Sequence, residues 1–67
     1  MDKAFISVVM PVYNEEKYIE NCIDSLLLQD YPQEFMEWIF VDGMSSDRTR
    51  ELIGAYIEKY PTLIKLL

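Results

Sequence analysis

The sequence predicts an α/β protein built on a three-stranded parallel sheet with βαβαβ connectivity. Two near-continuous apolar runs, residues 5–10 and 35–41, are rich in β-branched and aromatic residues, which is typical of buried strands. Each run is followed by a polar turn and then by apolar residues at helical spacing, and a third apolar run covers residues 63–67. Right-handed crossovers place these strands in the order 3-2-1, which is one half of a doubly wound, Rossmann-like fold.

The first strand, residues 5–10, is expected to be covered on both faces, because its apolar residues do not alternate with polar ones. Pro11 has no N–H for a strand ladder, so it is expected to mark the end of this strand. Asn14 is the expected N-cap of the first helix, and Glu15 and Glu16 complement the positive end of its dipole.

The first helix is expected to end near Leu28 or Gln29. Its apolar stripe consists of Tyr18, Ile19, Cys22, Ile23, Leu26 and Leu27. Residues 29–34 then supply a turn, in which Pro32 pushes the preceding tyrosine toward an extended conformation.

The second strand is expected over residues 35–41, and a turn over Asp42 to Ser45 follows it. Ser45 or Ser46 can cap the second helix, with Asp47 in its first turn. Apolar residues at helical spacing continue this helix until shortly before Pro61, and residues 63–67 form the third strand.

Length and charge limit the possible functions. Sixty-seven residues allow one small domain at most, and a net charge of −6 disfavours binding to nucleic acid or to anionic membranes. With a single cysteine and no histidine, the chain can form no internal disulfide and lacks the usual zinc ligands. We expect Cys22 to be a reduced thiol in the core, in a reducing compartment. No apolar run reaches the roughly 18 to 20 residues of a membrane span.

Asp42 is the first functional candidate, because ligands of open α/β sheets bind outside the carboxyl ends of the strands. Tyr13 offers a flat face at the end of the neighbouring strand, so a base N–H or a ribose hydroxyl could bind between the two residues. A glycine-rich dinucleotide turn and a P-loop are both absent from the sequence. Residue chemistry alone leaves two other roles open: Asp42 could bind turn amides, and Tyr13 could serve packing.

Three segments in order carry a specific resemblance to a known family. They are residues 6–19 (ISVVMPVYNEEKYI), 25–32 (SLLLQDYP) and 41–49 (VDGMSSDRT). Together they resemble the N-terminal part of family-2 glycosyltransferases, inverting enzymes of the GT-A fold that use sugar nucleotides. The resemblance covers nearly the whole chain, so residues 1–67 are expected to be the N-terminal nucleotide-binding portion of a longer domain.

The resemblance implies roles for individual residues. Pro11, Val12 and Tyr13 would line the nucleotide pocket, Glu15 would lie beside it, and Asp42 would contact the base, usually uracil. Ser45 and Asp47 belong to the same loop and would shape it.

The resemblance also implies an activity for the parent protein, which is the transfer of a sugar from a nucleoside diphosphate, here UDP, to an acceptor. A divalent metal, Mg or Mn, is held in the family by a later Asp-x-Asp motif, and a still later carboxylate is the general base. Both lie beyond Leu67, so no catalytic residue and no metal ligand is expected in this chain, which alone should be inactive. The expected location is the cytoplasm, or the cytoplasmic face of a membrane if the parent has membrane spans.

Two departures from the family concern the loop after the second strand: the second acidic residue is absent, and methionine stands at a glycine position. The family often has Asp-Asp-Gly-Ser where this chain has Asp42, Gly43, Met44 and Ser45. Gly43 is therefore expected to shape the loop by adopting the left-handed backbone conformation that glycine permits.

Two alternatives belong to other functional classes. The first is a non-enzymatic α/β domain that self-associates through the bare edge of its first strand and its apolar C-terminus, because exposed strand edges favour pairing. The second is a flavodoxin-like phosphoacceptor domain, which would need an acidic pair after the first strand. Glu15 and Glu16 match that pair only loosely.

Overall fold

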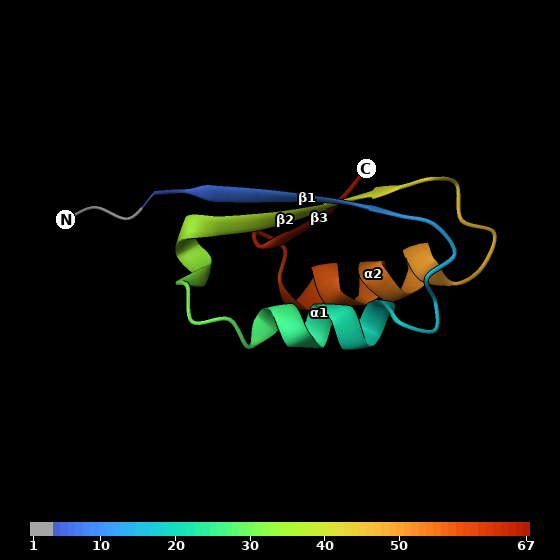
Figure 1. The fold of residues 1–67 in the computed structure, drawn as a ribbon, viewed down its shortest axis with the longest axis horizontal. Helices are drawn as coiled ribbons and strands as arrows, with labels where there is room; N and C mark the ends of the chain where they lie inside the picture. Colours follow the sequence, from blue (N-terminus) through green and yellow to red (C-terminus); the bar gives the residue numbers. More distant parts are fainter. Residues whose placement is uncertain (1–3) are drawn as a thin grey trace.

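Two helices cover one face of a three-stranded parallel sheet in the computed structural model, which describes residues 4–67 (Figure 1). The elements in order are β1 (Ile6–Val12), α1 (Ile19–Leu27), the 3₁₀ helix η1 (Gln33–Phe35), β2 (Met36–Asp42), α2 (Thr49–Lys59) and β3 (Ile64–Leu66). The sheet order is β1-β2-β3, which is the predicted order read from the opposite edge, and both strand pairs are parallel. The predicted α/β class and βαβαβ connectivity are confirmed.

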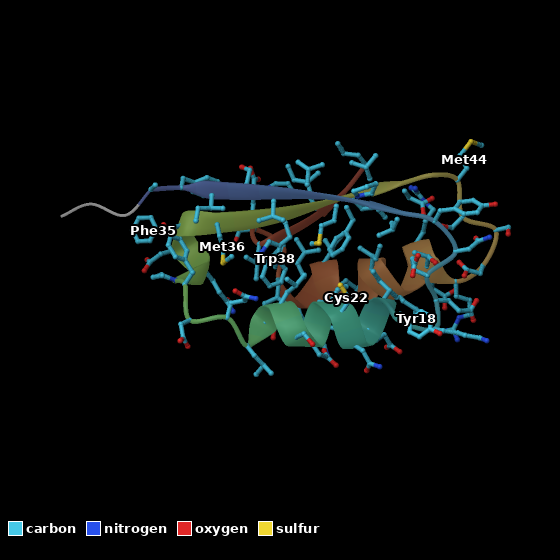
Figure 2. All side chains as sticks on the ribbon, viewed as in Figure 1. Tyr18, Cys22, Phe35, Met36, Trp38 and Met44 are labelled. Atoms are coloured by element: carbon cyan, nitrogen blue, oxygen red, sulfur yellow. The ribbon has the colours of Figure 1, made fainter. Side chains whose placement is uncertain are left out.

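The core lies between the sheet and the helices. Along β2, Met36, Trp38 and Phe40 are buried, whereas the residues between them are partly exposed. Figure 2 shows Met36 and Trp38 directed from β2 toward the helix layer. The buried apolar residues are Ile19, Ile23, Met36, Trp38, Phe40, Ile53, Leu63 and Ile64.

The opposite face of the sheet carries no helix, so the expectation that β1 is covered on both faces is wrong within residues 4–67. Val9 on β1 is 60% exposed, and Val41 on β2 is also exposed. The cause lies in the topology, because two successive right-handed crossovers in the same direction put both helices on the same side (Figure 1). Cys22, expected in the core, is also exposed, because it lines the open pocket between α1 and β1.

Pro11 does not end the first strand, because β1 continues through it to Val12. The carbonyl of Val12 accepts a hydrogen bond from the N–H of Gly43 at 2.8 Å, so Val12 faces β2. Since successive residues of a strand bond to opposite sides, the ring nitrogen of Pro11 faces the open edge of the sheet. A proline is tolerated there because no ladder hydrogen bond is lost.

The first helix begins later than predicted, at Ile19. Asn14 is not its N-cap but adopts a left-handed conformation with a φ of 49°. The carbonyl of Glu15 accepts hydrogen bonds from the N–H groups of Tyr18 and Ile19, which makes a turn before the helix proper. Glu15 and Glu16 therefore precede the first helical turn. Within residues 4–67, neither helix combines the length and apolar character that crossing a bilayer requires.

Candidate functional site

The carboxyl ends of β1 and β2 bring the two main candidate residues to the same edge of the sheet. Val12 lies opposite Asp42 in the parallel register, and Tyr13 follows Val12 directly. Tyr13 is 58% exposed, so much of its ring is open to solvent. Gly43 lies against it, because a Cβ placed on Gly43 would be 3.6 Å from Cδ1 of the Tyr13 ring. We refer to Tyr13, Asp42 and Gly43 as the rim.

The carboxylate of Asp42 holds its own turn. Oδ2 accepts a hydrogen bond from the N–H of Ser45 at 2.9 Å, and Oδ1 accepts one from the Ser45 hydroxyl at 2.5 Å. Arg50 of α2 adds a third contact, with Nη1 3.3 Å from Oδ2. Asp42 thus binds a turn amide, which is the structural role that the sequence left open for it.

These contacts also fix the charge of Asp42. Its side chain is fully shielded from solvent, whereas the Arg50 side chain is 53% exposed. The hydrogen bond from the Ser45 hydroxyl lowers the pKa of Asp42 below its usual value near 3.8, although burial opposes the shift. The group is therefore ionised at neutral pH and can only accept hydrogen bonds. Arg50 makes the longest of the three contacts, so it is the partner that a ligand could most readily replace.

A pair of hydrogen bonds joins the loop after β1 to the loop after β2. The N–H of Asn14 donates to Oγ of Ser45 at 2.8 Å, and the N–H of Ser46 donates to Oδ1 of Asn14 at 2.8 Å. Ser45 and Ser46 therefore do not cap α2, contrary to expectation. Their hydrogen bonds fix the loop against Asn14 instead.

Further hydrogen bonds connect the two loops next to the start of α2. Oγ1 of Thr49, the one buried polar residue within 4–67, accepts from the N–H of Glu15 at 2.8 Å and donates to Oδ1 of Asp47 at 2.5 Å. Oδ2 of Asp47 accepts from the N–H of Glu16 at 3.2 Å, and Oε1 of Glu16 accepts from the N–H of Arg48 at 3.1 Å. Asp47 lies before the helix rather than in its first turn.

The left-handed residue of the loop after β2 is Met44, with a φ of 66°, and not Gly43 as expected. Met44 stands at the position where the family often has glycine, and it keeps the backbone conformation that glycine would supply. Figure 2 shows its side chain pointing away from the protein, where it is 87% exposed. Gly43 instead donates its N–H to the carbonyl of Val12 at 2.8 Å, and a Cβ built on it would make only ordinary contacts with that carbonyl and the Tyr13 ring.

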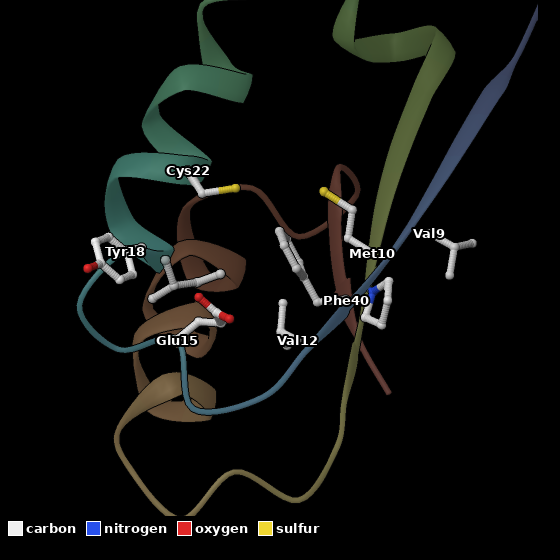
Figure 3. Close-up of a pocket in the computed structure, with 9 residues that line it drawn as sticks. Val9, Met10, Val12, Glu15, Tyr18, Cys22 and Phe40 are labelled. Carbon is white, nitrogen blue, oxygen red and sulfur yellow. The ribbon is translucent and has the colours of Figure 1, made fainter.

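A pocket of about 310 Å³ opens between β1 and α1, beside the rim (Figure 3). Its lining consists of Val9, Met10, Pro11, Val12, Glu15, Tyr18, Ile19, Cys22 and Phe40. Three of the predicted nucleotide-binding residues, Pro11, Val12 and Glu15, line it, whereas Tyr13 and Asp42 do not. Figure 3 shows Met10 on β1 and Cys22 on α1 facing each other across this apolar space.

Sequence reasoning assigned no inter-loop role to Asn14, Thr49 or Arg50. The signal for Asn14 was its residue type, because asparagine is enriched in left-handed conformations as well as at N-caps. Nothing local marked Thr49 or Arg50. Among residues 4–67, no group of three or more histidine, cysteine or acidic side chains is arranged to hold a metal ion.

Comparisons with known proteins give the same family for most of the chain. The model of the family described as Glycosyl transferase family 2 matches residues 7–67. A Methanococcus voltae dolichyl N-acetyl-alpha-D-glucosaminyl phosphate 3-beta-D-2,3-diacetamido-2,3-dideoxy-beta-D-glucuronosyltransferase is 43% identical over 56 residues, which are 84% of this chain and 17% of that protein. A poly(ribitol-phosphate) beta-glucosyltransferase of Bacillus spizizenii is 42% identical over 88% of this chain and 9% of its own length.

Two solved structures are similar to the whole arrangement. The mannosyltransferase PcManGT of Pyrobaculum calidifontis, in complex with GDP-Man and Mn2+, aligns with a TM-score of 0.88 and 31% identity over 100% of this chain and 20% of its own. TarS of S. aureus in complex with UDP-GlcNAc aligns with a TM-score of 0.77 and 38% identity over 94% of this chain and 18% of its own. This chain therefore spans a fifth or less of these relatives.

Proposed function

Because the chain belongs to glycosyl transferase family 2, we propose that residues 1–67 form the N-terminal nucleotide-binding portion of a domain that transfers a sugar from UDP to an acceptor. The observation that carries the proposal is the parallel register of Val12 and Asp42, which brings Tyr13 and Asp42 to one edge of the sheet. Ligands of open α/β sheets bind at this edge.

The rim has the chemistry to select a base. The exposed ring of Tyr13 offers a flat face for stacking, and the ionised Asp42 accepts a hydrogen bond from a ring N–H once Arg50 is displaced. Uracil carries such an N–H. The corresponding nitrogen of cytosine is an acceptor, and it would face the acceptor oxygens of Asp42. The proposal therefore includes preference for UDP over CDP.

The other residues predicted to bind the nucleotide or shape the loop support the base site. Pro11 and Val12 form the wall beside the base, and Glu15 lies in the adjoining pocket. Gly43, Ser45 and Asp47 shape the loop: Gly43 bonds the carbonyl of Val12 beside Tyr13, Ser45 orients Asp42, and Asp47 fixes the start of α2.

Chemistry in the parent protein would need groups outside residues 1–67. A divalent metal, Mg or Mn, would neutralise the diphosphate, and a carboxylate would deprotonate the acceptor hydroxyl. PcManGT was solved with Mn2+ and GDP-Man, which supports a metal in the complete domain. We propose that the 67-residue chain by itself binds the nucleotide and transfers no sugar, and that the parent works in the cytoplasm or on the cytoplasmic face of a membrane.

Calorimetric titration with UDP tests the binding role. Asp42→Asn keeps the shape of the side chain and one acceptor oxygen but removes its charge, and we expect it to weaken UDP binding roughly tenfold or more. Asp30→Asn, on the exposed turn after α1, is the matched control and should bind UDP as the unaltered chain does. Equal affinity of the Asp42 and Asp30 variants, or absence of UDP binding by the unaltered chain, would count against the proposal.

A second candidate function is self-association through the open edge of β1. It is favoured by the exposure of Val9 and by the apolar pocket along that edge. In the parent protein the same edge would instead be covered by the remainder of the domain. Sedimentation velocity of the 67-residue chain distinguishes a stable dimer from a monomer.

A further inference from the structure

Asn14 occupies the connection between the two loops that lies nearest the rim. Its N–H donates to the Ser45 hydroxyl and its Oδ1 accepts from the N–H of Ser46, so both loops are held at one residue. Its φ of 49° is a conformation that asparagine adopts more readily than most residues. A residue with a bulky or β-branched side chain could not make both bonds at this backbone conformation without strain.

The hydrogen bonds of Asn14 continue to Asp42. The Ser45 hydroxyl accepts from the N–H of Asn14 and donates to Oδ1 of Asp42, so it links the two residues. On the other side, Asn14 is joined to Tyr13 by the peptide bond itself. Asn14 is therefore connected to both side chains that are proposed to contact the base, although its own side chain bonds the loop and not the rim.

The fold does not depend on Asn14 alone to hold the loops together. One residue further along the chain, the N–H of Glu15 bonds Thr49, and the N–H of Glu16 bonds Asp47. These bonds lie at the start of α2, away from the rim. Loss of the Asn14 side chain removes the bond from the N–H of Ser46, so the loops should stay attached at Glu15 and Glu16 while the segment between Asp42 and Ser46 becomes less firmly held beside the rim.

We propose that Asn14 is a positioning residue, which sets the Tyr13 ring and the Asp42 carboxylate at the separation needed to hold one base between them. The proposal rests on the nucleotide-binding function proposed above and adds to it the residue that determines base discrimination. A purely structural role for Asn14 would lower thermal stability but would not change the preference of the folded protein for one base over another.

The test compares binding of UDP and CDP to the 67-residue chain and its variants by calorimetry, below the thermal midpoint of each. Asn14→Gly keeps access to the left-handed conformation and removes Oδ1, so we expect UDP affinity to fall roughly tenfold and the ratio of UDP to CDP affinity to fall toward one. Asn14→Asp restores an acceptor oxygen and should restore the ratio. Ser46→Ala removes only a hydroxyl that lies 3.5 Å from Oδ1 of Asn14, and it should bind like the unaltered chain.

The outcomes separate this inference from the function on which it rests. If the unaltered chain binds neither nucleotide, the proposed function fails and the role of Asn14 fails with it. If the unaltered chain prefers UDP and Asn14→Gly keeps the same preference, only the role of Asn14 is overturned. Should Asn14→Gly not fold, Ser45→Ala breaks the link that runs from the N–H of Asn14 through the Ser45 hydroxyl to Asp42, and an unchanged UDP to CDP ratio in that variant would overturn the inference.

Discussion

Replacing Thr49 by valine tests how much the connection between the two loops stabilises the fold. Thr49 is fully buried, and its hydroxyl accepts a hydrogen bond from the N–H of Glu15 and donates one to Asp47. Valine has nearly the same shape and is also β-branched, so packing and helix propensity change little. The substitution removes both hydrogen bonds and leaves the N–H of Glu15 without its acceptor.

The expected cost follows from the burial of these groups. Leaving a fully buried donor unsatisfied costs about 1–3 kcal/mol, and because the N–H of Glu15 is only partly buried we expect Thr49→Val to lower the free energy of unfolding by about 1 kcal/mol, the lower end of this range. In a domain of this size, a loss of 1 kcal/mol lowers the thermal midpoint by roughly 4–8 °C. Urea unfolding followed by the fluorescence of Trp38, the single tryptophan of the chain, measures the change directly.

Thr49→Ser is the matched control, because it keeps the hydroxyl and removes only the methyl group. Burial of one methyl contributes about 0.8 kcal/mol, so the serine variant should lose less stability than the valine variant. The reasoning is refuted if Thr49→Val is as stable as the unaltered chain, or if serine costs more than valine. Either result would mean that packing of the methyl group, and not the hydroxyl, holds this helix start.

Three further predictions concern backbone strain and ionisation. Met44→Gly should raise the thermal midpoint, because a left-handed conformation costs a residue with a side chain about 1–2 kcal/mol. The greater entropy of glycine in the unfolded chain offsets part of this gain. Met44→Ala should not raise the thermal midpoint. Hydrogen bonds lower the pKa of Asp42 and, against an opposing effect of burial, that of Asp47. The stability that the two ionised carboxylates contribute should be complete above their usual pKa near 3.8 and be lost as the pH falls through their lower pKa values in the folded protein. In Asp47→Asn the thermal midpoint should therefore depend less steeply on pH in the acid range. The hydroxyl of Tyr56 donates to Oδ1 of Asp24 at 2.6 Å, which raises the pKa of Tyr56 from 10.0 to about 12. This hydrogen bond should stabilise the fold fully below pH 10.0, and its contribution should decline as the pH rises through about 12. Urea melts of Tyr56→Phe should not show this decline.

The strand order and the meeting of Tyr13 with Asp42 at one sheet edge could be predicted, because both follow from general rules of parallel sheets. Two consecutive right-handed crossovers allow few arrangements of three strands, and the carboxyl ends of parallel strands lie at the same edge. The apolar runs that predicted the first two strands also led to the wrong prediction that the outer face of the sheet is covered. Val9 and Val41 are apolar but exposed, since apolar character indicates that a face should be covered and does not say which segment covers it.

The loop contacts could not be predicted, because they join residues that are far apart in the chain. Asn14 lies 31 positions before Ser45, and Glu15 lies 34 positions before Thr49. Their hydrogen bonds exist only once the strand register is set. Asparagine is favoured both at helix N-caps and in left-handed turns, and the local sequence around Asn14 does not distinguish the two.

The proline within β1 has a consequence for any polypeptide that adds to the open edge of the sheet. Ser7 and Val9 present N–H groups to an incoming strand, but Pro11 presents none, because its ring nitrogen carries no hydrogen. A fourth strand, whether from the parent protein or from another molecule, would lose one hydrogen bond there, although the Pro11 carbonyl could still accept one. Pairing with an added strand is therefore weakest at the end of β1 that leads to the tyrosine ring.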